Sequence, residues 1–208
     1  MAKIYLLFLF ILSFANAQDF KKDTIQLNET ILYDKSKFKL KRVGSDTKTK
    51  AVQIGLEVYI DLFKDSIPQF IKEIAIPLNA PKKEYTFQRL NFNFSELIKE
   101  DSIVLKVDLF TNKEGIPEKS LLNNPFEIVI KKEDQNDNIF TLDLRNYKIK
   151  SQGDFFIKVE LLTKSDKPIY FSGALLAKCL YRAKDSDKWR KTPLGLTPSI
   201  NADILIKK

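Results

Sequence analysis

The chain has 208 residues, with 35 Lys and Arg against 27 Asp and Glu, a formal net charge of +8 and no His. Without His, the chain can form no Ser-His-Asp triad, no Cys-His pair and no zinc site that uses imidazole. Its 6 Gly are scattered, so there is no phosphate-binding loop, and its 1 Cys cannot form a disulfide within the chain. We expect Cys179, in an apolar setting, to pack as a small hydrophobe. We expect no cofactor.

The N-terminus predicts export. Lys3 precedes an apolar run at residues 4–14, and Ala15 and Ala17 form a small-x-small cleavage site. The run is shorter than the about 20 residues that cross a bilayer, and Gln18 stands where a bacterial lipoprotein would have Cys. Residues 1–17 are therefore predicted to be a signal peptide. Residues 18–208 are expected to form a single domain with no transmembrane segment, in the periplasm, on the cell surface or outside the cell.

Residues 35–42 are the densest basic run, and there Lys and Arg alternate with Phe38 and Leu40. This alternation is typical of a strand with one solvated face. The other interpretation is a polyanion site. We expect no nucleic-acid partner, because the chain is predicted to be exported and has no recognition motif.

Alternation of apolar and polar residues continues through the chain and predicts β-strands. It is strongest at residues 51–64, 103–109, 126–132, 138–146 and 153–163, and weaker at 24–33, 37–43, 70–78, 84–94, 168–176, 177–183 and 202–208. Turn-forming clusters separate these segments, and one helical turn is expected within residues 94–101. The pattern predicts an all-β fold, an antiparallel two-sheet β-sandwich of jelly-roll type.

Residues 112–122, NKEGIPEKSLL, join two of the stronger strands. Their Gly, Pro and charged residues could form a ligand-binding loop or only a turn. Gly115 can adopt a positive φ and Pro117 has a fixed φ, which favours a turn over a binding loop. Leu121 and Leu122 are expected to cap the core.

Trp189 is the only Trp, and it lies in a charged, turn-rich stretch, unlike the Phe residues of the strands. An exposed Trp flanked by polar groups can stack on a pyranose ring. Trp189, with Tyr181, Tyr170 and Arg190, is therefore the candidate ligand-binding site. The alternative is that Trp189 covers an open end of the sandwich, because buried area dominates the energetics of aromatic side chains.

Paired carboxylates remain possible, because glycoside hydrolysis needs only two Asp or Glu residues. Asp108 and Glu160 lie on predicted strands, but Asp108 falls on the polar side of its strand among lysines. Surface charge is the favoured interpretation, since a general acid with a raised pKa needs an apolar pocket.

Asp134, Asn136 and Asn138 resemble the first ligands of an EF-hand calcium loop. Ile139 stands where that loop needs Gly, and Arg145 stands where it needs Glu. We therefore expect no metal. The sequence favours a plain turn here, with an irregular Ca²⁺ site as the weaker alternative.

Four stretches, at residues 115–122, 126–130, 139–162 and 186–204, resemble a family of exported proteins from Bacteroidota-type bacteria. They read GIPEKSLL, FEIVI, IFTLDLRNYKIKSQGDFFIKVELL and SDKWRKTPLGLTPSINADI, and the resemblance covers roughly residues 50–205. Relatives are often described as carboxypeptidase regulatory-like domain-containing proteins, in which an Ig-like module precedes this sandwich; we expect no such module here. The resemblance implies an exported β-sandwich, no peptidase activity and no catalytic residues to carry over.

The sequence thus predicts a non-catalytic, exported binding module of the cell envelope, with a glycan or a partner protein as ligand. A structural or assembly accessory of the outer membrane is the alternative. A carboxylate-based glycan hydrolase has less support.

Overall fold

The computed structural model describes residues 33–60, 69–165, 167–175, 177–183 and 188–208. The signal peptide predicted at residues 1–17 lies outside these ranges, as does nearly all of the weak strand predicted at residues 24–33. Residues 35–208 form one compact unit, and the fold described below is that of this unit.

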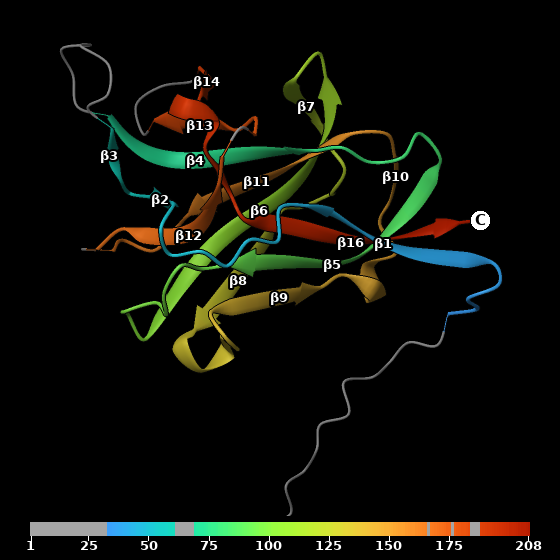
Figure 1. Ribbon diagram of the computed structural model, residues 1–208, viewed down its shortest axis with the longest axis horizontal. Helices are drawn as coiled ribbons and strands as arrows, with labels where there is room; N and C mark the ends of the chain where they lie inside the picture. The colour runs from blue at the N-terminus through green and yellow to red at the C-terminus, as the bar shows by residue number, and fades with distance from the viewer. Residues whose placement is uncertain (1–32, 61–68, 166, 176, 184–187) are drawn as a thin grey trace, which may run out of the picture. The chain divides into compact units, whose positions relative to one another are not determined.

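The first sheet pairs the first strand in the sequence, β1, with the last, β16 (Figure 1). Its order is β1–β16–β5, and both β9 and β10 pair with the far edge of β5. The strands are β1 (Phe38–Gly44), β5 (Glu84–Asn93), β9 (Ile139–Asp143), β10 (Lys150–Gln152) and β16 (Ile200–Lys207). Within the described residues β1 pairs with β16 alone, and its side chains Lys39 and Lys41 suit an exposed edge, because Lys discourages pairing with other chains.

The second sheet has the order β14–β13–β4–β11–β6, with β7 and β8 both on β6, and β3 on β4. Its strands are β3 (Tyr59–Ile60), β4 (Gln69–Leu78), β6 (Ser102–Lys113), β7 (Ile116–Ser120), β8 (Phe126–Lys131), β11 (Phe155–Leu161), β13 (Leu180–Ala183) and β14 (Arg190–Lys191). A third, small sheet has the order β15–β12–β2, with β2 (Gln53–Leu56), β12 (Ile169–Ala174) and β15 (Thr197–Pro198).

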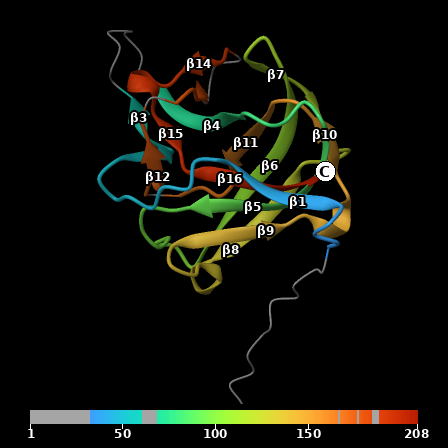
Figure 2. The ribbon, with the colours of Figure 1, turned by 45° about the vertical axis from the view of Figure 1, so that its right-hand side comes forward.

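The core lies between the first two sheets. Figures 1 and 2 show β5 and β16 in one layer, with β6 and β11 in the layer behind them. Phe87 of β5 meets Phe155 of β11 edge to face, with ring centroids 4.8 Å apart. Phe94 and Phe171 stack at 4.9 Å and connect the third sheet to the same core. The predicted all-β, antiparallel fold is confirmed and is consistent with a β-sandwich. The third sheet was not predicted, and the jelly-roll topology stays a prediction.

The single long strand predicted at residues 51–64 is wrong. Its described part is divided between β2 and β3, which belong to different sheets. Glu57 between them has a φ of 56°, in the left-handed region. At Gly55, a Cβ would lie 2.6 Å from Val58 and 2.8 Å from the Ile169 carbonyl oxygen. The alternating pattern therefore continues from β2 to β3 without any sign that the chain passes from one sheet to another.

The helical turn predicted within residues 94–101 is also wrong, because none of these residues is helical. Ser95 N donates to the Tyr170 carbonyl at 3.1 Å, and Ile98 N donates to Gln135 Oε1 at 2.9 Å. These amides bond to distant segments and are not available for the i−4 carbonyls of a helix.

Candidate functional site

β4 loses one of its two neighbours before it ends. It pairs with β11 as far as Leu78, but its ladder with β13 stops where Leu180 faces Ala75. Pro77 has no amide hydrogen with which to continue that ladder. The chain before Leu180 turns instead toward the 3₁₀ turn η3 (Pro193–Gly195), where Ala177 N donates to the Gly195 carbonyl at 2.9 Å. Residues 76–78 of β4 therefore lack β13 as a neighbour.

A cleft of about 1130 Å³ lies along this edge. The cleft is lined by the end of β4, the tip of the β6–β7 hairpin, and the segment from β13 through β14 and η3 to β15. The end of β1 and Asp154 complete the lining. The lining mixes aliphatic, amide and hydroxyl groups with charges of both signs, and includes Ile76, Pro77, Leu78, Asn79, Asn112, Glu114, Gly115, Ile116, Asp154, Lys178, Cys179, Trp189, Lys191, Thr192 and Thr197. Such a mixture suits recognition of a ligand that has both apolar and polar parts.

The hairpin tip comes from NKEGIPEKSLL. The predicted turn is confirmed, with Glu114 at φ 54° and Gly115 at φ 84° between the two strands. Positive φ at both central residues is the turn whose twist matches a two-stranded hairpin, and Asn112 Oδ1 accepts a hydrogen bond from Gly115 N at 2.9 Å. Leu121 and Leu122 pack against the core as predicted. Yet the tip also lines the cleft, so the turn and the binding-loop interpretations are not exclusive.

Trp189 is half-buried and lines the cleft. The Arg182 guanidinium lies over its ring, 4.8 Å from the centroid, and the indole packs against a small apolar cluster of Ala75, Phe156 and Leu180. This cluster lies on the face of the second sheet opposite the core. Trp189 therefore covers a sheet face and borders the cleft at the same time.

The other three predicted site residues do not line the cleft. Tyr181 is 2% exposed and belongs to the core, because side chains alternate along β13 and its neighbours Leu180 and Arg182 take the face that carries Trp189. Its burial gives no support to a ligand contact at Tyr181, which stays a prediction. Tyr170 lies on β12 opposite Gly55, and Arg190 lies on β14 opposite Tyr181.

The prediction that Asp108 and Glu160 are surface charges is wrong, because both side chains are buried. They lie on the face of the second sheet opposite the core, but neighbouring side chains cover them. Asp108 accepts a hydrogen bond from Ser120 Oγ at 2.7 Å and faces Lys158 in the β6–β11 register. Glu160 Oε1 is 3.0 Å from Lys72 Nζ.

The electrostatics of Glu160 favour its ionised form. Burial raises its pKa, but the hydrogen bond from Lys72 and the charges of Lys72 and Lys158 outweigh burial, so that the pKa lies below its ordinary value. This carboxylate is therefore held as an anion between cations.

Asp134, Asn136 and Asn138 lie in a connection from β8 to β9 that begins with the 3₁₀ turn η1 (Lys132–Asp134). Asp134 Oδ2 accepts a hydrogen bond from Lys131 N at 2.9 Å. Asn136 and Ile139 exchange backbone hydrogen bonds, with Asn138 between them at φ 63°. These contacts are those of local turns, and the described residues contain no group of three or more His, Cys, Asp or Glu that could hold a metal.

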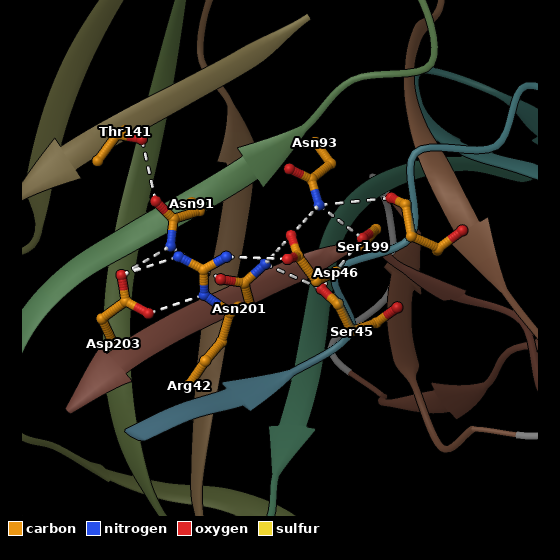
Figure 3. Close-up of polar contacts among 10 residues, drawn as sticks. Arg42, Ser45, Asp46, Asn91, Asn93, Thr141, Ser199, Asn201 and Asp203 are labelled. Atoms are coloured by element: carbon orange, nitrogen blue, oxygen red, sulfur yellow. Dashed lines mark hydrogen bonds and ion pairs between the residues drawn. The ribbon is translucent and has the colours of Figure 1, made fainter. Parts of the chain in front are cut away.

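A second polar cluster lies on the face of the first sheet opposite the core (Figure 3). Arg42 of β1 donates to Asp203 of β16 through Nε at 2.8 Å and Nη2 at 3.1 Å, and through Nη1 to Asp46 at 2.8 Å. The hydrogen bond to Asp203 is the main reason that the pKa of Arg42 is raised. Arg42, from the basic run at residues 35–42, is thus tied to the sheet.

Buried amides and hydroxyls extend this cluster to the cleft. Asn93 Nδ2 donates to Ser199 Oγ at 2.9 Å, while Ser199 Oγ and Asn201 Nδ2 both donate to the Ser45 carbonyl at 3.0 Å. Ser45 also lines the cleft, so the cluster fixes one wall of it. Its sequence signal is the polar alternation of Asn91 with Asn93, matched by Asn201 and Asp203 in the paired strand and by Ser199 directly before it.

Comparisons of the chain with protein-family models, with curated proteins and with solved structures found no match. The resemblance to an exported Bacteroidota-type family stays a prediction. Among the described residues, no helix has both the length and the apolar character that crossing a membrane requires.

Proposed function

We propose that this protein is a non-catalytic, exported binding module, and that the cleft beside β4 takes an extended segment of a partner protein of the cell envelope. The observation that carries the proposal is the edge of β4 at residues 76–78, which has β11 on one side and borders the cleft. A strand edge can pair with an added peptide through main-chain hydrogen bonds, while flanking pockets take alternate side chains. Pro77 limits this pairing, so contacts with the cleft walls must supply much of the affinity.

The apolar side chains around the cleft favour a peptide. Ile116 at the hairpin tip is 53% exposed, and Leu194 in η3, beside the lining residue Gly195, is 80% exposed. Leu194 also has a φ of 55°, a conformation that costs free energy for a residue with a Cβ and that clusters at functional sites. An exposed aliphatic group at the cleft and another beside its lining suit the side chains of an extended chain.

A glycan is the alternative ligand, and Trp189 is the group expected to stack on it. The Arg182 guanidinium already lies over that ring, so a pyranose on the same face would have to displace it. A carboxylate-based hydrolase has less support, since its general acid needs a raised pKa, whereas the pKa of Glu160 is lowered. An accessory role in outer-membrane assembly would use the same cleft.

Selection of a displayed library of random peptides on the purified protein tests this proposal. Enriched peptides are expected to bind the Ile116→Arg variant about tenfold or more weakly than wild type, because the substitution places a long charged side chain at the cleft. Val129→Arg is the matched control: Val129 is 55% exposed on β8 and is not a lining residue. That variant is expected to bind like wild type.

Two results would count against the proposal. One is an equal loss of peptide binding in both variants. The other is the absence of enriched peptides together with retention of the protein on an array of polysaccharides, which would favour the glycan ligand.

A further inference from the structure

Thr197, a residue that lines the cleft, has a buried hydroxyl with no oxygen or nitrogen partner among the described residues. Thr197 on β15 is 3% exposed, and its Oγ1 is one of four buried side-chain polar atoms without a hydrogen-bond partner among the described residues. The other three belong to Asn93, Glu100 and Gln135, none of which lines the cleft, whereas Thr197 does. Buried polar groups are nearly always hydrogen-bonded, so this exception requires an explanation.

The neighbouring Cys179 thiol does not satisfy this hydroxyl. Cys179 Sγ donates to the Leu180 carbonyl at 3.5 Å, and a sulfur atom is a weak acceptor. Burial raises the pKa of Cys179 by more than hydrogen bonds from the Thr197 hydroxyl and the Leu180 backbone lower it. The thiol therefore stays protonated at neutral pH, and its sulfur offers the Thr197 hydroxyl only a weak acceptor.

Thr192, a second buried Thr in the lining, behaves differently. Its hydroxyl contacts the Leu196 carbonyl, and the Cys179 carbonyl at 3.4 Å. Its amide also donates to the Cys179 carbonyl, at 3.0 Å. The Thr192 hydroxyl therefore ties η3 to the segment before β13, while the Thr197 hydroxyl has only the weakly accepting Cys179 sulfur beside it.

We infer that Thr197 Oγ1 recognises the main chain of the bound segment, donating its hydrogen to a backbone carbonyl or accepting one from a backbone amide. The inference rests on the proposed function and names a residue that determines what the cleft accepts. An extended peptide presents carbonyl and amide groups along both of its edges. The bound ligand then supplies the hydrogen bond that the free protein lacks, so a polar main chain is preferred to a purely apolar ligand.

Three variants test the inference with an enriched peptide, by titration calorimetry and thermal unfolding. Thr197→Val removes the hydroxyl and keeps the shape of the side chain. It is expected to raise the melting temperature, since an unsatisfied buried group is lost, and to weaken peptide binding about five- to tenfold. Thr197→Ser keeps the hydroxyl and should retain wild-type affinity within about twofold. Thr163→Val is the control outside the cleft: it removes a hydroxyl that accepts from Val104 N at 2.6 Å, so it should lower the melting temperature and leave affinity nearly unchanged.

The outcomes separate this inference from the proposed function. A lower melting temperature in Thr197→Val would overturn the inference, because it would mean that the hydroxyl is satisfied in the free protein. Equal loss of affinity in Thr197→Ser would also overturn it, as would wild-type affinity in Thr197→Val when Ile116→Arg has lost binding. In that last case the proposed function stands. If Ile116→Arg binds as wild type does, the proposed function fails, because the peptide does not occupy the cleft.

Discussion

Charged side chains on the outer face of the second sheet form ion pairs. Glu73 Oε2 accepts from Arg182 Nε at 2.7 Å, and Glu73 Oε1 is 3.6 Å from Lys158 Nζ. The same Arg182 lies over Trp189. Removal of one member of a buried pair leaves an uncompensated charge and destabilises the fold more than the pair stabilises it. Trp189 is therefore positioned at the cleft by a charge network, and not by apolar packing alone.

Glu160 gives a pH dependence that can be tested. Its pKa in the folded protein is lower than the ordinary 4.5, so its stabilising effect is present above that pH and is lost as the pH falls through the folded pKa. Lys72→Met removes the cation that lowers the pKa. The variant should melt below wild type at neutral pH, and the difference should shrink as the pH falls below about 4.5.

Thermal unfolding of both proteins across the pH range measures this effect. Lys39→Met, at an exposed position of β1, is the control and should show no comparable pH-dependent difference. A Lys72→Met difference that stays constant down to about pH 3 would mean that the pairing with Glu160 is not its cause.

Residue identity predicted part of the candidate site. Trp189 stands out because it is the only Trp and has charged neighbours. Thr197 could not be found in this way, since the state of its hydroxyl depends on Cys179 and on the cleft, which distant segments bring together. The burial of Tyr181 could not be predicted either, because β13 has only 4 residues and so short an alternation does not reveal which face is buried.

At the level of elements, most predicted strands are present because alternation reports which face of a strand is buried. Alternation does not report where a strand changes partners. The alternating pattern of β2 and β3 is that of one strand. The pattern of β4 is the same along its whole length, although its pairing with β13 ends at Ala75. The cleft exists because of that departure, so the sequence pattern identified the strands but could not predict the cleft. Pro77 is the one local signal of it.

Gly55→Ala tests the close approach of β2 and β12. The added Cβ would lie 2.6 Å from Val58 Cγ2 and 2.8 Å from the Ile169 carbonyl oxygen, so we expect the free energy of unfolding to fall by about 1–3 kcal/mol. Denaturant unfolding measures the change.

Gly115→Asn is the matched control. Gly115 has φ 84° and nothing within 4 Å of an added Cβ, and Asn tolerates this conformation, so the cost should stay below about 1 kcal/mol. Equal losses in the two variants would contradict the steric account of Gly55.

At the level of the whole unit, the fold depends on pairing between distant parts of the chain. β16 lies between β1 and β5, and the buried polar cluster of Figure 3 crosses these strands to reach the Ser45 wall of the cleft. The strand composition predicted an all-β unit with a large aromatic core. It could not predict which strands would be neighbours, because each strand offers a similar apolar face to every other.

The most direct test of the account is a crystal structure of the protein with a peptide enriched on it. We predict that the peptide lies extended in the cleft, beside residues 76–78 of β4 and between the hairpin tip and Trp189, with a main-chain group within hydrogen-bond distance of Thr197 Oγ1. A peptide bound elsewhere on the protein, with the cleft unoccupied, would contradict the account.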